Sequence, residues 1–145
     1  MFINNNKTYI NTKRLTTKWY LIDAKNQTLG RLCSKIAYIL QGKNSTIYLP
    51  SQIQSIKIII INSQLITISG KKREQKIYKR HSGQPGGLKQ EKFNALLLRL
   101  PNRILEKAIK GMLPKNTLGR KLITHLKIYP SHEHPYANHE HLHLI

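Results

Sequence analysis

The sequence predicts an α/β protein in which helices pack on a mostly parallel sheet. Segments with strand character alternate with segments of helical periodicity, an order that favours parallel strands joined by helical crossovers. The run 56–61 is almost entirely β-branched, which is typical of a strand covered on both faces. The length of 145 residues fits one domain with a hydrophobic core. We therefore expect a single α/β sandwich.

The first strand and the first helix are the clearest elements. Residues 19–24 form an apolar strand that ends near Asp23. Thr28 is the expected N-cap of a helix over 29–40, because apolar residues recur there along one helical face. Gly42 is the residue type that commonly ends such a helix.

The remaining elements follow from β-branched runs and from breaks at Gly and Pro. Pro101 separates two stretches of helical periodicity, because proline starts a helix more readily than it continues one. The full set is strands over 56–61, 65–69 and 127–129, and helices over 93–100, 102–112 and 118–125.

Three regions are expected along the chain. Residues 1–18 are polar, lack acidic residues and contain no apolar block of the kind a secretory signal needs. They are interpreted as a basic N-terminal arm on a partner, and a transit peptide is the alternative. Residues 19–130 form the single α/β domain. Residues 131–145 form a polar tail that holds five of the seven histidines.

Charge is the strongest compositional signal. Lys and Arg number 25 against 6 acidic residues, so the formal net charge is +19 and the sequence pI is about 10.3. Such a charge on a compact body favours a polyanionic partner, and a pI in this range is typical of nucleic-acid-binding proteins. No apolar run approaches the ~20 residues that a membrane span needs, and a single cysteine excludes a disulfide framework.

The stretch 71–89 is the most informative segment for function. Seven cationic or imidazole side chains fall within 71–81, ahead of a Gly/Pro-rich loop over 83–87 whose backbone N–H groups can approach phosphates. Tyr78 and His81 are expected to stack on bases. The alternative is a solvated basic face, which the overall charge makes less favourable than a nucleic-acid site.

The residues give little support to catalysis, a cofactor or a metal. The loop 83–87 has neither dinucleotide-fingerprint nor P-loop spacing, and a single Asp with five scattered Glu forms no evident acid–base pair. Cys33 lies on the apolar face of its helix, so we interpret it as an inert core residue. A metal-dependent enzyme built on the histidine tail stays open as a rival, although the tail lacks HExxH spacing.

Several motifs resemble one family. They are Trp19-Tyr20-Leu21-Ile22-Asp23-Ala24, Leu29-Gly30-Arg31-Leu32, Thr67-Ile68-Ser69-Gly70-Lys71-Lys72, His81-Ser82-Gly83, Gly86-Gly87-Leu88-Lys89, Ala108-Ile109-Lys110-Gly111-Met112-Leu113-Pro114-Lys115-Asn116 and Leu118-Gly119-Arg120. In this order they resemble the bacterial-type large-subunit ribosomal protein L-thirteen family. The resemblance extends from about Lys7 to the C-terminus, and the stretch 108–116 is its most specific part.

The resemblance implies a three-layer α/β/α sandwich with basic loops and extended termini. It implies a structural constituent of the large ribosomal subunit, without catalytic activity, that binds 23S-type ribosomal RNA and supports subunit assembly and translation. The implied partners are this RNA and neighbouring large-subunit proteins, with no membrane, small-molecule substrate or cofactor. The alternative is a free RNA- or DNA-binding regulator acting off the ribosome.

The family's RNA-contacting regions correspond by position to two groups of side chains in this sequence. The first group is Lys71, Lys72, Arg73, Lys76, Lys79, Arg80, His81 and Lys89, and the second is Lys110, Lys115, Arg120, Lys121 and Lys127. Weaker candidates are Lys7, Lys13, Arg14 and Arg31.

Residue usage bears on origin. The chain contains 20 Ile, 18 Lys and 11 Asn but no Val. Packing does not explain that absence, since Val and Ile are both β-branched core residues, whereas AT-rich coding does. With the family resemblance, this predicts an organelle-encoded copy in a plastid (chloroplast) of algal type. A mitochondrion or an AT-rich bacterium are the alternatives.

Overall fold

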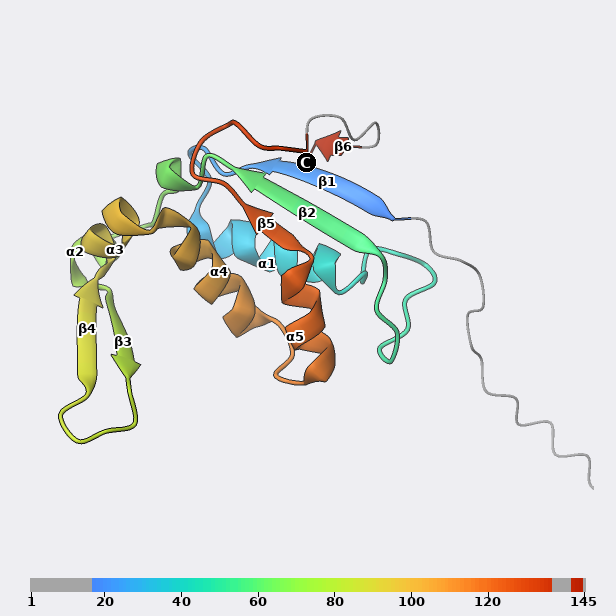
Figure 1. Ribbon diagram of the computed structural model, residues 1–145. Coiled ribbons are helices and arrows are strands. Elements are labelled where there is room, and N and C mark those ends of the chain that lie inside the picture. The colour runs from blue at the N-terminus through green and yellow to red at the C-terminus, as the bar shows by residue number, and fades with distance from the viewer. Residues whose placement is uncertain (1–16, 137–141, 145) are drawn as a thin grey trace, which may run out of the picture.

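The centre of the fold is a four-stranded sheet with the strand order β5-β2-β1-β6 (Figure 1). The computed structural model describes residues 17–136 and 142–144. Its elements are β1 (Lys18–Asp23), α1 (Leu29–Leu40), β2 (Ile56–Ile61), η1 (Ser63–Leu65), α2 (Lys72–Gln75), β3 (Ile77–His81), β4 (Leu88–Lys92), α3 (Phe93–Arg99), α4 (Pro101–Met112), α5 (Thr117–Thr124), β5 (Leu126–Ile128) and β6 (Leu142–Leu144).

All three strand pairings in this sheet are parallel, which confirms the predicted parallel α/β architecture. β1 and β2 pair over their whole length, from Lys18 opposite Ile56 to Asp23 opposite Ile61. The shorter strands β5 and β6 pair with β2 and β1, respectively. The two longest strands are therefore the inner pair.

The two faces of the sheet are covered differently. Ile58 and Ile60 join the core formed with α1 and α4, and Figure 1 shows α1, α4 and α5 together beneath the sheet. Trp19 lies opposite Lys57 in the ladder and so faces the other way, where the ring of Tyr136 lies 5.4 Å from it, centroid to centroid. In the described residues the second face is thus partly covered by the extended segment 129–136, while the helices form the layer on the first.

α1 follows its predicted bounds because its apolar stripe is the buried side of the helix. Leu32, Cys33 and Ile36 are all buried. Gly42 has φ +73° and its N–H donates to the Ile39 carbonyl at 2.8 Å, so the helix ends as expected. Thr28 occupies the N-cap position, but its side chain makes no capping hydrogen bond there.

The predicted strand over 65–69 is wrong. Asn62 adopts the left-handed region at φ 58°, which turns the chain out of the sheet and into the 3₁₀ helix η1. The following residues pair with the β1–α1 turn: the Thr67 N–H donates to the Gln27 carbonyl at 3.0 Å, and the Leu29 N–H donates to the Thr67 carbonyl at 2.9 Å. Thr67 therefore forms an isolated bridge with Thr28.

Polar contacts fix the start of α4. The Ser63 hydroxyl donates to Asn102 Oδ1 at 2.6 Å, and Asn102 Nδ2 donates to the Ile128 carbonyl at 3.0 Å. One side chain therefore ties η1, α4 and β5 together. Since Ile104, Leu105 and Ile109 are fully buried, the opposite side of α4 is left facing solvent.

The bounds of the other predicted elements agree with the structure to within one or two residues. The sequence did not indicate η1, α2, β3, β4 or β6. The proposed division into arm, domain and tail stays a prediction. Most of the arm, residues 1–16, lies outside the described residues, as do residues 137–141 and 145 of the tail.

Candidate nucleic-acid interface

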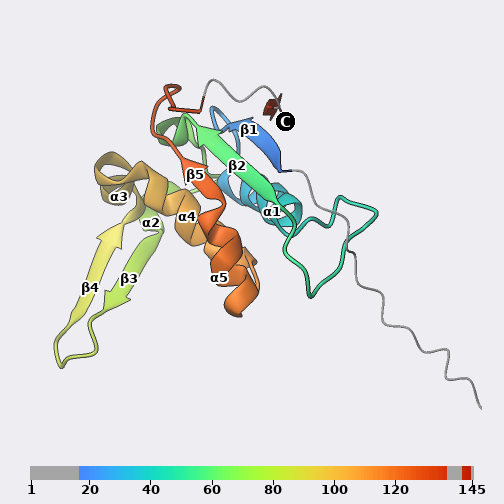
Figure 2. The ribbon, with the colours of Figure 1, turned by 45° about the vertical axis from the view of Figure 1, so that its right-hand side comes forward.

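A two-stranded antiparallel hairpin carries much of the basic block. β3 and β4 pair from Ile77 opposite Lys92 to His81 opposite Leu88, and the hairpin extends away from the central sheet (Figures 1 and 2). Its tip is a Gly-rich turn in which Gly83 and Gly86 have φ values of 91° and 71°.

Arg80 and Lys89 face each other directly across this hairpin. Like charges in that position destabilise a strand pair unless a counter-ion lies between them. Both side chains are exposed. The pair therefore favours an anionic ligand on that face of the hairpin.

The exposed side of α4 forms a second cationic wall. Arg103, Lys107 and Lys110 recur at helical spacing and all are exposed, as is Glu106 between them. Together with the hairpin they line a cavity of about 660 Å³. We call it the cationic groove; its lining residues are Tyr78, Lys79, Arg80, Lys89, Gln90, Glu91, Leu96, Arg99, Arg103, Glu106, Lys107 and Lys110.

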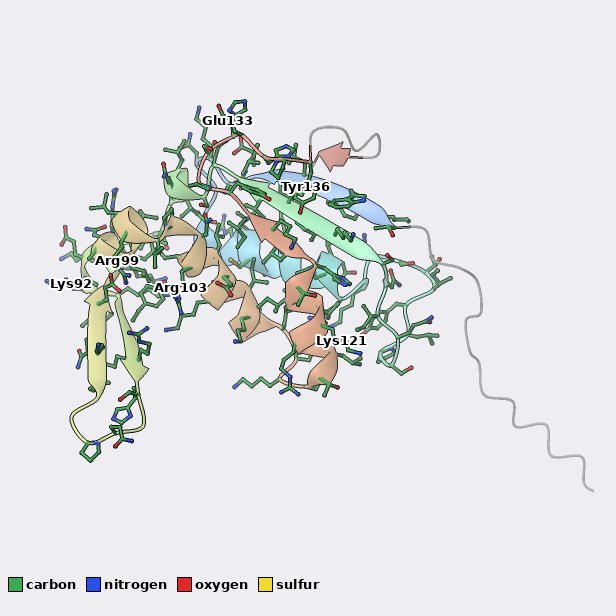
Figure 3. The ribbon with its side chains drawn as sticks, in the orientation of Figure 1. Lys92, Arg99, Arg103, Lys121, Glu133 and Tyr136 are labelled. Atoms are coloured by element: carbon green, nitrogen blue, oxygen red, sulfur yellow. The ribbon has the colours of Figure 1, made fainter. Side chains whose placement is uncertain are left out.

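An ion pair joins the hairpin to the helices at the groove. Arg99 Nη2 donates to Glu91 Oε2 at 2.7 Å and Arg99 Nε donates to Glu91 Oε1 at 3.1 Å, a bidentate arrangement. The hydrogen bonds from Arg99 lower the pKa of Glu91, and those to Glu91 raise the pKa of Arg99. Figure 3 shows Arg99 and Arg103 on the side of the helices that faces the hairpin.

Tyr78 serves as an anchor of the hairpin and not as the base-stacking platform that we expected. Its ring stacks on Phe93 with centroids 6.4 Å apart, and the ammonium groups of Lys107 and Lys76 lie 5.0 and 5.5 Å from its centroid. Burial raises the pKa of the Tyr78 phenol. The ring faces are therefore occupied by protein groups. His81 is exposed, and its Nδ1 accepts a hydrogen bond from the Gly83 N–H at 2.9 Å.

The structure gathers part of the first predicted group in the groove and the rest near the base of the hairpin. Lys79, Arg80 and Lys89 line the groove. Lys71, Lys72, Arg73 and Lys76 lie in or beside α2, all exposed, and α2 packs on α3. Arg73 Nε donates to Asn94 Oδ1 at 3.2 Å, which links these two helices.

The second predicted group does not form one surface. Lys110 lines the groove, whereas Lys115, Arg120 and Lys121 surround α5, which Figure 3 shows well away from the hairpin. Lys127 pairs with Ile59 in the ladder and is exposed on the sheet face opposite the helices. Arg31 is exposed on α1, and the weaker candidates Lys7, Lys13 and Arg14 lie outside the described residues.

The sequence reasoning missed Arg99, Arg103 and Lys107. Their spacing of four residues was available as a signal, because it places them along one side of consecutive helical stretches. What the sequence could not show was the hairpin that faces them.

The part of the chain that the structure describes contains no candidate metal site. Within residues 17–136 and 142–144, no group of three or more His, Cys, Asp or Glu side chains is arranged to hold an ion. His132 and His134 are described, while His139 and His141 are not. Cys33 is buried, and burial raises the pKa of its thiol to about 12. Among the same residues, no helix has the length and apolar character of a membrane span.

Comparison with known proteins agrees with the motifs. The family model described as ribosomal protein L13 matches residues 17–135. The large ribosomal subunit protein uL13c of Gracilaria tenuistipitata var. liui is 58% identical over 133 residues, covering 92% of this chain and 93% of the relative. The uL13 protein of a Cyanothece strain is 54% identical over 132 residues, covering 90% and 89%, and uL13c of Porphyra purpurea is 54% identical over 132 residues, covering 91% and 93%.

These relatives are ribosomal proteins and not enzymes, in agreement with the prediction that the chain is not an enzyme. The family model spans β1, β2 and β5 of the sheet, the hairpin and all the helices described above, and it ends before β6. The chain therefore belongs to the ribosomal protein L13 family of the large ribosomal subunit.

Proposed function

We propose that this protein is a structural constituent of the large ribosomal subunit that binds large-subunit ribosomal RNA and supports subunit assembly. The observation that carries the proposal is the cationic groove. Its seven Lys and Arg side chains against two carboxylates leave a formal charge of +5 in one concave site. A concentration of like charge on exposed side chains is favourable when a polyanion neutralises it.

The mechanism is electrostatic clamping by a fixed frame. The core of α4 and the Arg99–Glu91 ion pair hold the two walls of the groove, so the cations are spaced before the RNA arrives. Phosphates then fill the sites and release counterions, which contributes ~0.7–0.9 per contact to the slope of log affinity against log salt. The proposed contacts are Lys79, Arg80, Lys89 and Lys110 in the groove.

Further proposed contacts lie outside the groove, at sites that reach other parts of a large RNA. Those near the hairpin base and tip are Lys71, Lys72, Arg73, Lys76 and His81. Those at α5 are Lys115, Arg120 and Lys121, and Lys127 lies on the sheet face opposite the helices. We include the arm 1–18 and the tail 131–145 as segments that lie on RNA or on neighbouring proteins.

We infer that the ribosome in question is that of a plastid. Two red-algal uL13c proteins and a cyanobacterial uL13 among the relatives support this inference. The 20 Ile and the absence of Val support it too, since AT-rich coding of the kind expected in an organelle genome accounts for them.

Sedimentation tests the proposed function. A native lysate is run through a sucrose gradient after a high-salt wash, and the fractions are probed for this chain. We expect stoichiometric migration with the large subunit after the wash. Recovery in the free fraction alone would contradict the proposal and favour a regulator acting off the ribosome.

A further inference from the structure

The cationic groove has charge on two facing walls, which restricts the shape of its ligand. Arg80 and Lys89 project from the hairpin, and Arg103, Lys107 and Lys110 project from α4. A duplex laid on the protein surface would contact only the rim of such a groove. A single sugar–phosphate backbone carries phosphate oxygens toward both sides and is able to contact both walls at once.

The size of the groove points the same way. Its volume of about 660 Å³ is that of a small-molecule pocket, which holds a short stretch of one strand. Two contacts close its base: the bidentate Arg99–Glu91 ion pair, and the Lys107 ammonium 5.0 Å from the centroid of the Tyr78 ring. The hairpin and α4 diverge from there (Figures 1 and 2), so the strand enters from the open end.

The aromatic chemistry of the groove excludes base stacking as the main contact. Tyr78 is the aromatic residue among those that line the groove, and its ring is covered by Phe93 and two ammonium groups. Proteins that hold single strands without sequence preference combine a cationic groove for the backbone with aromatic platforms for bases. This groove supplies the cations and no free aromatic platform, so the sugar–phosphate backbone of the RNA is the part that it recognises.

Resting on the proposed RNA binding, we propose that the cationic groove holds the sugar–phosphate backbone of an unpaired RNA strand, in preference to a duplex. Glu91 does not oppose this ligand, since Arg99 neutralises it. Glu106 does oppose it, and the five cations in excess over the carboxylates outweigh that repulsion.

The test measures binding of the full chain to two probes with equal numbers of phosphates, a short oligouridylate and a fully paired RNA hairpin, by fluorescence anisotropy across a salt series. The groove variant is Arg103→Gln with Lys110→Gln, which leaves the contact between Lys107 and the Tyr78 ring in place. The matched control is Lys35→Gln with Lys43→Gln, which removes the same charge from exposed positions on and after α1. Circular dichroism verifies that both variants fold.

We expect the unmodified chain to bind oligouridylate more tightly than the hairpin. The groove variant should lose that preference. Its salt slope for oligouridylate should fall by about 1.4, because each of the two lost contacts with a single strand contributes ~0.7. The control should keep the preference. Equal or tighter binding of the hairpin, or equal losses in the groove variant and the control, would overturn the proposal.

The two proposals fail separately. Sedimentation away from the large subunit, together with a groove-dependent preference for oligouridylate, refutes the ribosomal role and supports the single-strand site. Stable migration with the subunit, together with tighter hairpin binding, refutes the single-strand site and supports the ribosomal role.

Discussion

Replacing Gly119 with alanine should destabilise the fold, although Gly119 lies in the helix α5 and alanine is the better helix former. The reason is the close approach of the preceding turn. A methyl group at Gly119 would clash with the carbonyl oxygen of Pro114 and lie 2.9 Å from its carbonyl carbon. Because both atoms belong to the backbone, rotation of a side chain cannot relieve the clash.

The same turn is fixed by a helix cap, which prevents it from moving away freely. Asn116 Oδ1 accepts a hydrogen bond from the Gly119 N–H at 2.8 Å, and Leu113 beside it is buried. Moving the turn would weaken a cap worth about 1 kcal/mol. Overpacking of this kind costs about 1–3 kcal/mol. We therefore expect Gly119→Ala to lower the free energy of unfolding by roughly that amount.

Gly111 provides the matched control, since it also lies in a helix but has no atom within 4 Å of the position that a methyl group would take. Gly111→Ala should be neutral or should stabilise α4 by up to about 1 kcal/mol. Urea denaturation of the RNA-free chain measures both changes; with a slope of ~1–3 kcal/mol per molar, the two midpoints should move in opposite directions or differ by about 1 M. Equal midpoints for both variants would refute the reasoning.

Three further predictions concern single groups. Cys33 should resist a thiol reagent in the native chain and react stoichiometrically in denaturant, because burial raises its pKa to about 12 and the thiolate is the reactive form; equal rates in both conditions would show an open site. Arg99→Gln should raise the pKa of Glu91, followed by NMR titration of its carboxyl group. Since that pKa is lowered in the folded chain, the pair stabilises the fold above the ordinary Glu pKa, and this contribution is lost as the pH falls through the folded value. Glu106→Gln should tighten RNA binding more than Glu74→Gln, which removes a carboxylate outside the groove; weaker binding would instead indicate a direct contact between Glu106 and the RNA.

The central sheet and its helices were predictable because each presents a periodic apolar face. The stripe of α1 and the β-branched run of β2 are such faces, and both elements have the bounds that the sequence indicated. The segment after Asn62 was not predictable in this way. Its apolar residues resemble a strand, while a left-handed backbone at Asn62 sends them to the β1–α1 turn.

The site was predictable in composition and not in shape. The strands β3 and β4 are exposed apart from Tyr78 and Glu91, so they lack the apolar alternation that marks a half-buried strand. Because the hairpin was not predicted, nothing in the sequence indicated that the cations of α4 form one wall of a groove. The sequence consequently indicated which segments are basic but not how they are arranged. It placed Lys110 and Arg80 in two different groups, although both line one groove.

The strand order of the sheet also determines when the fold can be completed. The inner strands β1 and β2 come from residues before 62, whereas the strands that cover their outer edges come from residues after 125. During synthesis, the paired inner strands therefore keep open backbone hydrogen-bonding edges until the last part of this sequence has been made. Unpaired edges are templates for association with other chains. The nascent chain is thus open to such association until β5 and β6 are added.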